Sequence, residues 1–205
     1  MLPLDISFWD LFLIQFQQTS LFEWIGLITT LICIYLATVE NVWNWPVSII
    51  SIVISAFIYF KSGLFGDFYL QFHFLFTAFY GWYYWLEKKK ENDKPIVSIS
   101  LKEWSIAIVA ILVFSGVFGI LIDKFTLSDV PYEDGFCTAM SFVAQLMLTR
   151  KVLQNWILWI IVDTCYVPLL IYKGLNVYAV LYGILVILAI KGYLDWRKIY
   201  RGQAN

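Results

Sequence analysis

The stretch from residue 154 to residue 196 reads QNWILWIIVDTCYVPLLIYKGLNVYAVLYGILVILAIKGYLDW. It contains two apolar segments, 154–172 and 176–195, which are separated only by a turn around Lys173 and Gly174. Each segment is close to the roughly 20 residues that a helix needs to cross about 30 Å of hydrocarbon. The stretch therefore predicts a membrane-spanning helical hairpin with one carboxylate, Asp163, deep inside it.

The composition of the whole chain also predicts a membrane protein. Of the 205 residues, 61% are hydrophobic and 14% are charged, whereas a soluble domain carries about 25% charged residues. The net charge of −1 gives no indication of nucleic-acid binding. We expect neither a metal site nor a cofactor, because His73 is the single histidine and Cys33, Cys137 and Cys165 lack the spacing of metal ligands.

The hydrophobic pattern predicts an all-α polytopic membrane protein with seven transmembrane helices. A shorter apolar segment, residues 6–18, is interrupted by glutamines and predicts a helix that lies in the membrane interface. The seven predicted spans are 21–39, 44–60, 68–86, 103–122, 134–149, 154–172 and 176–195. The fifth of them is the shortest.

The distribution of lysine and arginine predicts the orientation. With the N-terminus outside, eleven of the 14 basic residues lie at or near the cytoplasmic side. Only Lys61, Lys124 and Lys173 then lie outside. Seven spans then place the C-terminus in the cytoplasm.

The two halves of the chain resemble each other without a gap at a shift of 111 residues. The shift places Asn44 and Trp45 on Asn155 and Trp156, and it also matches two Gly-x-x-x-Trp endings, Gly81 to Trp85 and Gly192 to Trp196. Each span moves by four positions, so the two copies point the same way and form a parallel repeat. The predicted units are an interfacial helix (1–20), a three-helix repeat (21–87), a loop with a linker helix (88–125) and a second three-helix repeat with the tail (126–205).

Asp163 is the acidic residue that lies deepest within a predicted span. Trp156, Trp159 and Tyr166 share its helix face at spacings of three and four residues. Indole faces attract cations and stack on flat rings, so this face favours a planar, polar or cationic ligand. The alternative is that the tryptophans belong to the interfacial belt and that Asp163 only pairs with a neighbouring helix.

Three further polar residues open the last span, namely Asn176, Tyr178 and Tyr182. The 111-residue shift matches Tyr182 to Gln71, so both should lie at one depth on equivalent helices. An amide donates and accepts hydrogen bonds, which suits a carboxamide on a ligand. The alternative is hydrogen bonding between helices, which contributes only about 0.6 kcal/mol on average.

The segment WNWP at 43–46 predicts the start of a span, with Asn44 as its cap and Pro46 in its first turn. Because Asn44 and Asn155 are equivalent in the two repeats, Asn44, Trp45 and Asn155 are also candidates for a gate at the cytoplasmic end. His73 should be a packed, neutral histidine. Nothing resembles a phosphate-binding loop or a nucleophile with its base.

Taken in order, these segments resemble PnuC, the family of bacterial nicotinamide riboside transporters. The resemblance rests on WNWP, the segment from Gly66 through Gln71 to Trp85, the Trp156, Trp159 and Asp163 group, and NVYAVLY at 176–182. It implies a fold of three, one and three helices like that of the SWEET sugar transporters, and a homotrimer. It also implies facilitated diffusion of nicotinamide riboside, which a cytoplasmic kinase would trap by phosphorylation.

Other functions stay open at this point. Relatives of the family carry thiamine or riboflavin, which are flat and aromatic too, so the tryptophan and tyrosine faces do not choose among them. A non-transporting membrane assembly protein would fill its polar faces with helix contacts and leave no cavity. An intramembrane enzyme would need Asp163 and His73 within about 3 Å or bridged by one water, and no nucleophile accompanies them, so we expect no enzyme.

Overall fold

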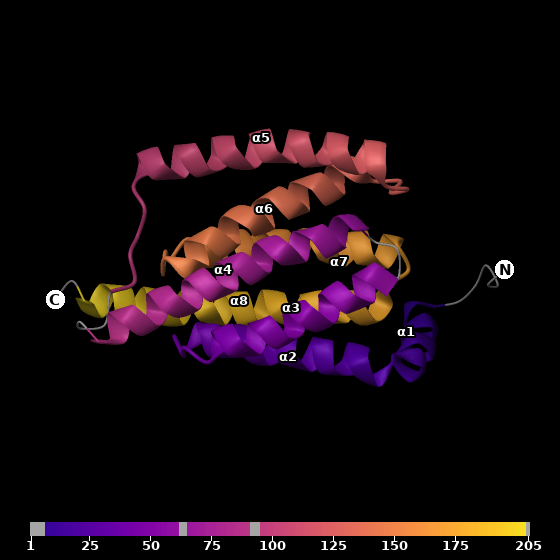
Figure 1. Cartoon of the computed structure of the whole chain (residues 1–205), viewed down its shortest axis with the longest axis horizontal. Helices are drawn as coiled ribbons and strands as arrows, with labels where there is room; N and C mark the ends of the chain where they lie inside the picture. The colour runs from indigo at the N-terminus through magenta and orange to yellow at the C-terminus, as the bar shows by residue number, and fades with distance from the viewer. Residues whose placement is uncertain (1–6, 62–64, 91–94, 204–205) are drawn as a thin grey trace.

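The structure, a computed structural model, describes residues 7–61, 65–90 and 95–203. Within these ranges the chain forms eight α-helices that run largely side by side (Figure 1). The helices are α1 (Phe8–Gln18), α2 (Leu21–Thr38), α3 (Asn44–Lys61), α4 (Phe65–Lys90), α5 (Leu101–Phe125), α6 (Pro131–Thr149), α7 (Asn155–Tyr172) and α8 (Asn176–Gln203).

Local sequence signals explain where several helices begin. Ser20 and Ser100 each accept a hydrogen bond from the backbone of a glutamate three residues later, and each glutamate bonds back to the serine. These two capping boxes satisfy backbone groups that the first helical turn leaves unpaired. Pro131 occupies the first turn of α6, where its missing N–H costs nothing. The seven predicted spans overlap helices α2 to α8, one span for each helix.

The helices are apolar enough for a multi-pass membrane protein. By length and hydropathy, α2, α5, α7 and α8 could each cross a membrane. Only 17% to 33% of their most apolar windows is buried inside the protein, so much apolar surface faces outward, as it does in lipid. The start of α6 is more polar, because Glu133 and Asp134 lie in its first turn.

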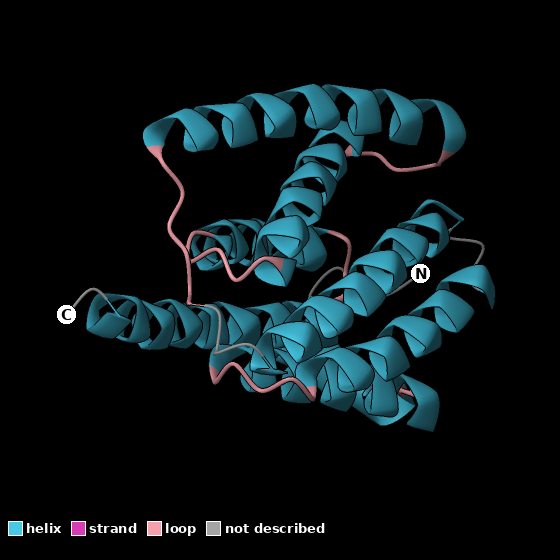
Figure 2. Cartoon of the chain, turned by 60° about the vertical axis from the view of Figure 1, so that its left-hand side comes forward, coloured by secondary structure: helices cyan, strands magenta, loops and turns pink. Residues whose placement is uncertain are grey.

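The contacts between helices define two groups of three consecutive helices. Helices α2, α3 and α4 pack on one another in sequence, and α6, α7 and α8 do the same. Between the groups, α2 packs on α8 and α4 packs on α6. The 111-residue shift matches α2 with α6 and α4 with α8. The contact of α2 with α8 is therefore equivalent to the contact of α6 with α4. Helix α5 lies along α6 at the edge of the molecule (Figures 1 and 2).

Helix α1 lies across the end of the bundle at which α8 begins (Figure 1). Gln15 donates a hydrogen bond to the carbonyl of Gly174 and accepts one from the backbone N–H of Asn176 at 2.9 Å. Asn176 in turn donates its side-chain amide to the carbonyl of Phe8 at 2.9 Å. No residue of α1 is buried, so its apolar side chains, such as Trp9, remain available to the membrane interface.

Candidate functional site

Four buried tryptophans gather at the end of the bundle opposite α1, and we call them the tryptophan cluster: Trp45, Trp85, Trp156 and Trp196. Trp45 meets Trp85 edge to face, with ring centroids 5.3 Å apart and planes at 89°. Trp156 meets Trp196 in the same way, at 5.5 Å and 89°. Trp85 and Trp196 lie 6.1 Å apart and join the two pairs. The sequence repeat therefore reappears as a pseudo-symmetric aromatic core.

In each pair, a glycine allows one indole to lie directly against a helix: Gly192 of α8 for Trp156, and Gly81 of α4 for Trp45. A Cβ atom on Gly192 would lie 2.6 to 2.7 Å from three ring atoms of Trp156. A Cβ atom on Gly81 would lie 2.3 to 2.7 Å from three ring atoms of Trp45. Real Cβ contacts of that length essentially do not occur. In each Gly-x-x-x-Trp ending, the glycine therefore leaves room for one indole, and the tryptophan meets that indole edge to face.

Two indole N–H groups connect the two groups of helices. Trp85 on α4 donates to the carbonyl of Thr149 on α6, and Trp196 on α8 donates to the carbonyl of Ala37 on α2, both at 3.2 Å. The cluster is thus hydrogen-bonded across the boundary between the groups in both directions. Among the described residues, the buried indole nitrogens of Trp45 and Trp156 have no hydrogen-bond partner.

The two equivalent asparagines have equivalent contacts beside this cluster. The side-chain amide of Asn44 donates to the carbonyl of Asn41 at 2.8 Å, and that of Asn155 donates to the carbonyl of Val152 at 2.6 Å. We expected Asn44 to cap this span. Asn44 is the first residue of α3, and its side-chain amide closes the preceding turn. Both asparagines are buried.

Further along α7, Asp163 lies in an apolar environment with only 4% of its surface exposed. No side chain in the part of the chain that the structure describes donates a hydrogen bond or forms an ion pair with its carboxylate. One turn away, Trp159 packs against two different hydrophobic clusters, and its buried indole nitrogen has no partner among the described residues. Tyr166 of α7 and Tyr182 of α8 meet with ring centroids 4.7 Å apart.

These four residues, Trp159, Asp163, Tyr166 and Tyr182, form the candidate binding face. Trp156 shares their helix face but lies within the tryptophan cluster, with 1% of its surface exposed. Gln71 of α4 is buried, and its side chain already has an interaction partner. The candidate face therefore combines indole, carboxylate and phenol groups within a short length of α7 and α8.

The other two predicted binding residues, Asn176 and Tyr178, lie at the start of α8, within two turns of Tyr182. Tyr178 is half-buried and packs with Tyr182 and side chains of α1 and α2. Asn176 is 2% exposed and is hydrogen-bonded to Phe8, so in this arrangement it holds α1. His73 stacks on Phe142 of α6, with ring centroids 3.5 Å apart and planes at 15°, which agrees with the packed histidine that we expected.

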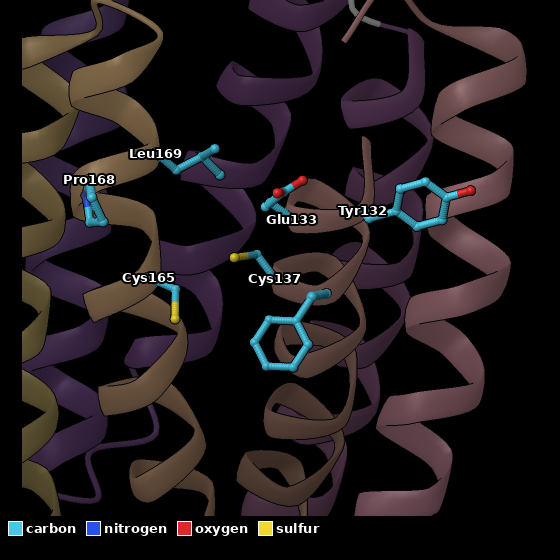
Figure 3. A pocket seen from close by; sticks show the side chains of 7 residues that line it. Tyr132, Glu133, Cys137, Cys165, Pro168 and Leu169 are labelled. Atoms are coloured by element: carbon cyan, nitrogen blue, oxygen red, sulfur yellow. The ribbon is translucent and has the colours of Figure 1, made fainter. Parts of the chain in front are cut away.

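A cavity of about 570 Å³ opens between α6 and α7 on another side of α7 (Figure 3). Its lining is mostly apolar and comes from Tyr132, Glu133, Phe136, Cys137, Cys165, Pro168 and Leu169. None of the predicted binding residues belongs to this lining. Asp163 is two residues from Cys165, and two residues along a helix correspond to a rotation of about 200°. Asp163 therefore points to another side of α7 than Cys165. Trp159 and Tyr166, however, pack against the same hydrophobic cluster as the lining residue Cys137, so the cavity borders the candidate binding face.

Sequence reasoning missed three residues at the ends of the bundle. Gln15 was expected only to interrupt the apolar pattern, yet it binds the start of α8. Glu40 and Lys151 form an ion pair. A signal for that pair was present, because the 111-residue shift places Glu40 on Lys151. Opposite charges at equivalent positions are not counted as a match when only identical residues are compared.

Comparisons with known proteins agree on one family. The family model described as nicotinamide mononucleotide transporter matches residues 20–198. The chain is 26% identical to the nicotinamide riboside transporter PnuC of Escherichia coli, over 86% of this chain and 85% of that protein. It is 27% identical to the riboflavin/roseoflavin transporter RibM of Streptomyces davaonensis, over 85% and 83% of the two chains. The crystal structure of the vitamin B3 transporter PnuC has the same fold, with a TM-score of 0.74 at 20% identity, over 95% of this chain and 90% of that one.

Proposed function

We propose that this chain, which belongs to the nicotinamide mononucleotide transporter family because the family model matches residues 20–198, carries nicotinamide riboside across the membrane. The match over nearly the whole chain is the observation on which the proposal depends. The name of the Escherichia coli relative supports the riboside as substrate. Transport would be facilitated diffusion, and a cytoplasmic kinase would trap the riboside as its phosphate.

The candidate binding face has the chemistry that such a substrate needs. Nicotinamide riboside presents a flat cationic ring, a carboxamide and ribose hydroxyls. Trp159 would stack on the ring, because indole faces attract cations, and Asp163 would supply the negative charge. Gln71 would hydrogen-bond the carboxamide or a diol edge, and the phenols of Tyr178 and Tyr182 would contact the ribose.

Charge favours the riboside over its mononucleotide at this face. A phosphate would bring about two negative charges next to Asp163. This residue is 4% exposed, and its carboxylate has no basic partner among the described residues. Charges that are taken out of water need partners. We therefore propose that the mononucleotide is excluded, although the family description names it.

The proposed arrangement in the membrane follows the two groups of helices. Helices α2 to α4 and α6 to α8 would be parallel three-helix repeats joined by the linker α5, with the substrate path between them. The family supports a bacterial inner membrane as the location. The N-terminus would lie outside and the C-terminus in the cytoplasm, as the basic residues predict. Trp156 and the proposed gate residues Asn44, Trp45 and Asn155 would then close the cytoplasmic end. Three copies would form a homotrimer.

A competition series tests the substrate. Purified protein is titrated with nicotinamide riboside while tryptophan fluorescence is followed, and three competitors are compared: the mononucleotide, a riboside without the carboxamide, and thiamine. We expect the riboside to bind and both altered ribosides to compete poorly, since a polar site loses affinity when a hydrogen-bonding group is missing. Equal competition by the mononucleotide would refute the charge argument.

Riboflavin is the second candidate substrate, because the chain is as similar to RibM as to PnuC by identity. Riboflavin is flat but uncharged, so its binding would not need Asp163. An Asp163→Asn variant separates the two substrates. It should weaken binding of the cationic riboside strongly and leave riboflavin binding nearly unchanged.

A further inference from the structure

The turns after α2 and after α6 are joined by one ion pair. Lys151 Nζ lies 2.8 Å from Glu40 Oε2, and the side chains are 9% and 20% exposed. Lys151 Nζ also lies 5.0 Å from the centre of the Trp85 ring, over its face. The pair is therefore shielded from water at one edge of the tryptophan cluster, where an ion pair is screened less than on an open surface.

The partners of this ion pair occupy the same position in the two repeats. They are 111 residues apart, which is the shift that superimposes the two halves of the sequence. Both have left-handed backbone torsions, with φ of 53° at Glu40 and 55° at Lys151. Residues with a Cβ adopt this conformation at a cost, and neither position is a glycine. Both turns therefore keep a strained residue that bears a charge, and the two charges are opposite.

Two hydrogen bonds near the pair cross between the two groups of helices. Trp85 donates to the carbonyl of Thr149, which lies just before Lys151 in the chain. Trp196 donates to the carbonyl of Ala37, which lies just before Glu40. A path that opens at this end between the repeats would have to separate these turns. The ion pair would break during that separation, because its atoms come from opposite sides.

The turn of Lys151 is also held from a third direction. The backbone N–H of Val97 donates to the carbonyl of Lys151 at 3.0 Å, and the N–H of Leu153 donates to the carbonyl of Val97 at 2.8 Å. Ile96, next to this bridge, is 1% exposed and belongs to the same core as the tryptophan cluster. These hydrogen bonds fix the turn that carries Lys151, and Glu40 contacts Lys151 from the other repeat.

We propose that Glu40 and Lys151 form a latch that keeps the substrate path closed at the tryptophan cluster. They are positioning residues that act on the gate and do not contact substrate. The latch rests on the proposed transport function, since it would set how often the path opens at this end. Removing either charge should favour the open state, and exchanging the two charges should restore the closed one.

The test measures opening directly at Thr149, which is fully buried beneath the latch. A Thr149→Cys substitution introduces a thiol of similar size, and its rate of reaction with a water-soluble maleimide is followed in the purified full-length protein by peptide mass spectrometry. The native Cys137, which is 2% exposed and packs against a different cluster, reports unfolding in the same sample. Glu40→Gln and Lys151→Met are compared with the exchange Glu40→Lys/Lys151→Glu, each in the Thr149→Cys background.

We expect each single variant to react at least about tenfold faster at position 149, with Cys137 unchanged, and the exchange to return within about threefold of the parent. The matched control is Lys173→Met, which removes an ion pair of 2.7 Å with Asp134 at the other end of the bundle and should leave the rate unchanged. The latch is refuted if the single variants react at the parental rate, if the exchange reacts as fast as they do, or if Cys137 reacts in parallel.

The labelling rate is independent of the substrate, so the two proposals can fail separately. Binding of nicotinamide riboside to the parent protein is measured in parallel by tryptophan fluorescence. Charge-dependent labelling without riboside binding would retain the latch and overturn the proposed substrate. Riboside binding with unchanged labelling would overturn the latch alone.

Discussion

An alanine at Gly192 should destabilise the protein although alanine favours helices. Its Cβ would lie 2.6 to 2.7 Å from three ring atoms of Trp156. That indole is 1% exposed and stands edge to face with Trp196, so it has no open space into which to move. Overpacking of this kind costs about 1–3 kcal/mol, which for a chain of this length lowers the melting temperature by about 2 to 12 °C.

The same helix offers a matched control. A Cβ on Gly183 would meet nothing within 4 Å, so Gly183→Ala should gain the helix preference of alanine, about 0.5–1 kcal/mol. Thermal unfolding of both variants in one detergent, followed by near-ultraviolet circular dichroism, gives the comparison. Replacing Trp156 by the smaller phenylalanine should recover part of the loss in the Gly192→Ala background. If Gly192→Ala melts at or above Gly183→Ala, the close seating of the indole on α8 is wrong.

Three other expectations concern binding, the position of α1 and orientation. Trp159→Ala should weaken riboside binding by about 1–3 kcal/mol, as loss of aromatic stacking on a base does. Trp43→Ala, which changes an exposed indole, should leave binding unchanged, and calorimetric titration measures both variants. Gln15→Ala should speed hydrogen exchange in α1 and in the first turn of α8, whereas Gln17→Ala, at an exposed position, should leave it unchanged. A reporter enzyme that is active only outside the cytoplasm should be inactive when fused after Asn205, and activity there would reverse the proposed orientation.

The hydrophobic pattern predicts the helices well, because the length of an apolar segment and the polar breaks around it are both local in sequence. The differences lie where helices continue into water. Helix α4 runs to Lys90 although the predicted span ends at 86, and α8 runs to Gln203 although its span ends at 195. Hydropathy marks the part of a helix that lies in hydrocarbon, whereas backbone hydrogen bonds carry the helix further.

Helical spacing indicates which residues share a face, but it does not identify the neighbouring helix at each depth. Trp156 and Trp159 were grouped for this reason, yet Gly192 and Trp196 surround the first, while the second packs against two separate clusters. Asn176 was grouped with Tyr178 and Tyr182 in the same way. The docking of α1, which comes from about 160 residues away in sequence, occupies its side chain instead.

The ion pair between Glu40 and Lys151 also bears on the ancestry of the chain. A two-fold assembly of identical first halves would place one glutamate against another, and identical second halves would place lysine against lysine. At the 2.8 Å that separates the present partners, like charges would repel by an amount on the order of 5 kcal/mol at an effective dielectric constant of about 20. Opposite charges at this position are compatible only with two unlike halves. If the two repeats descend from one ancestral unit, divergence at these two positions means that neither repeat can form this ion pair with a copy of itself.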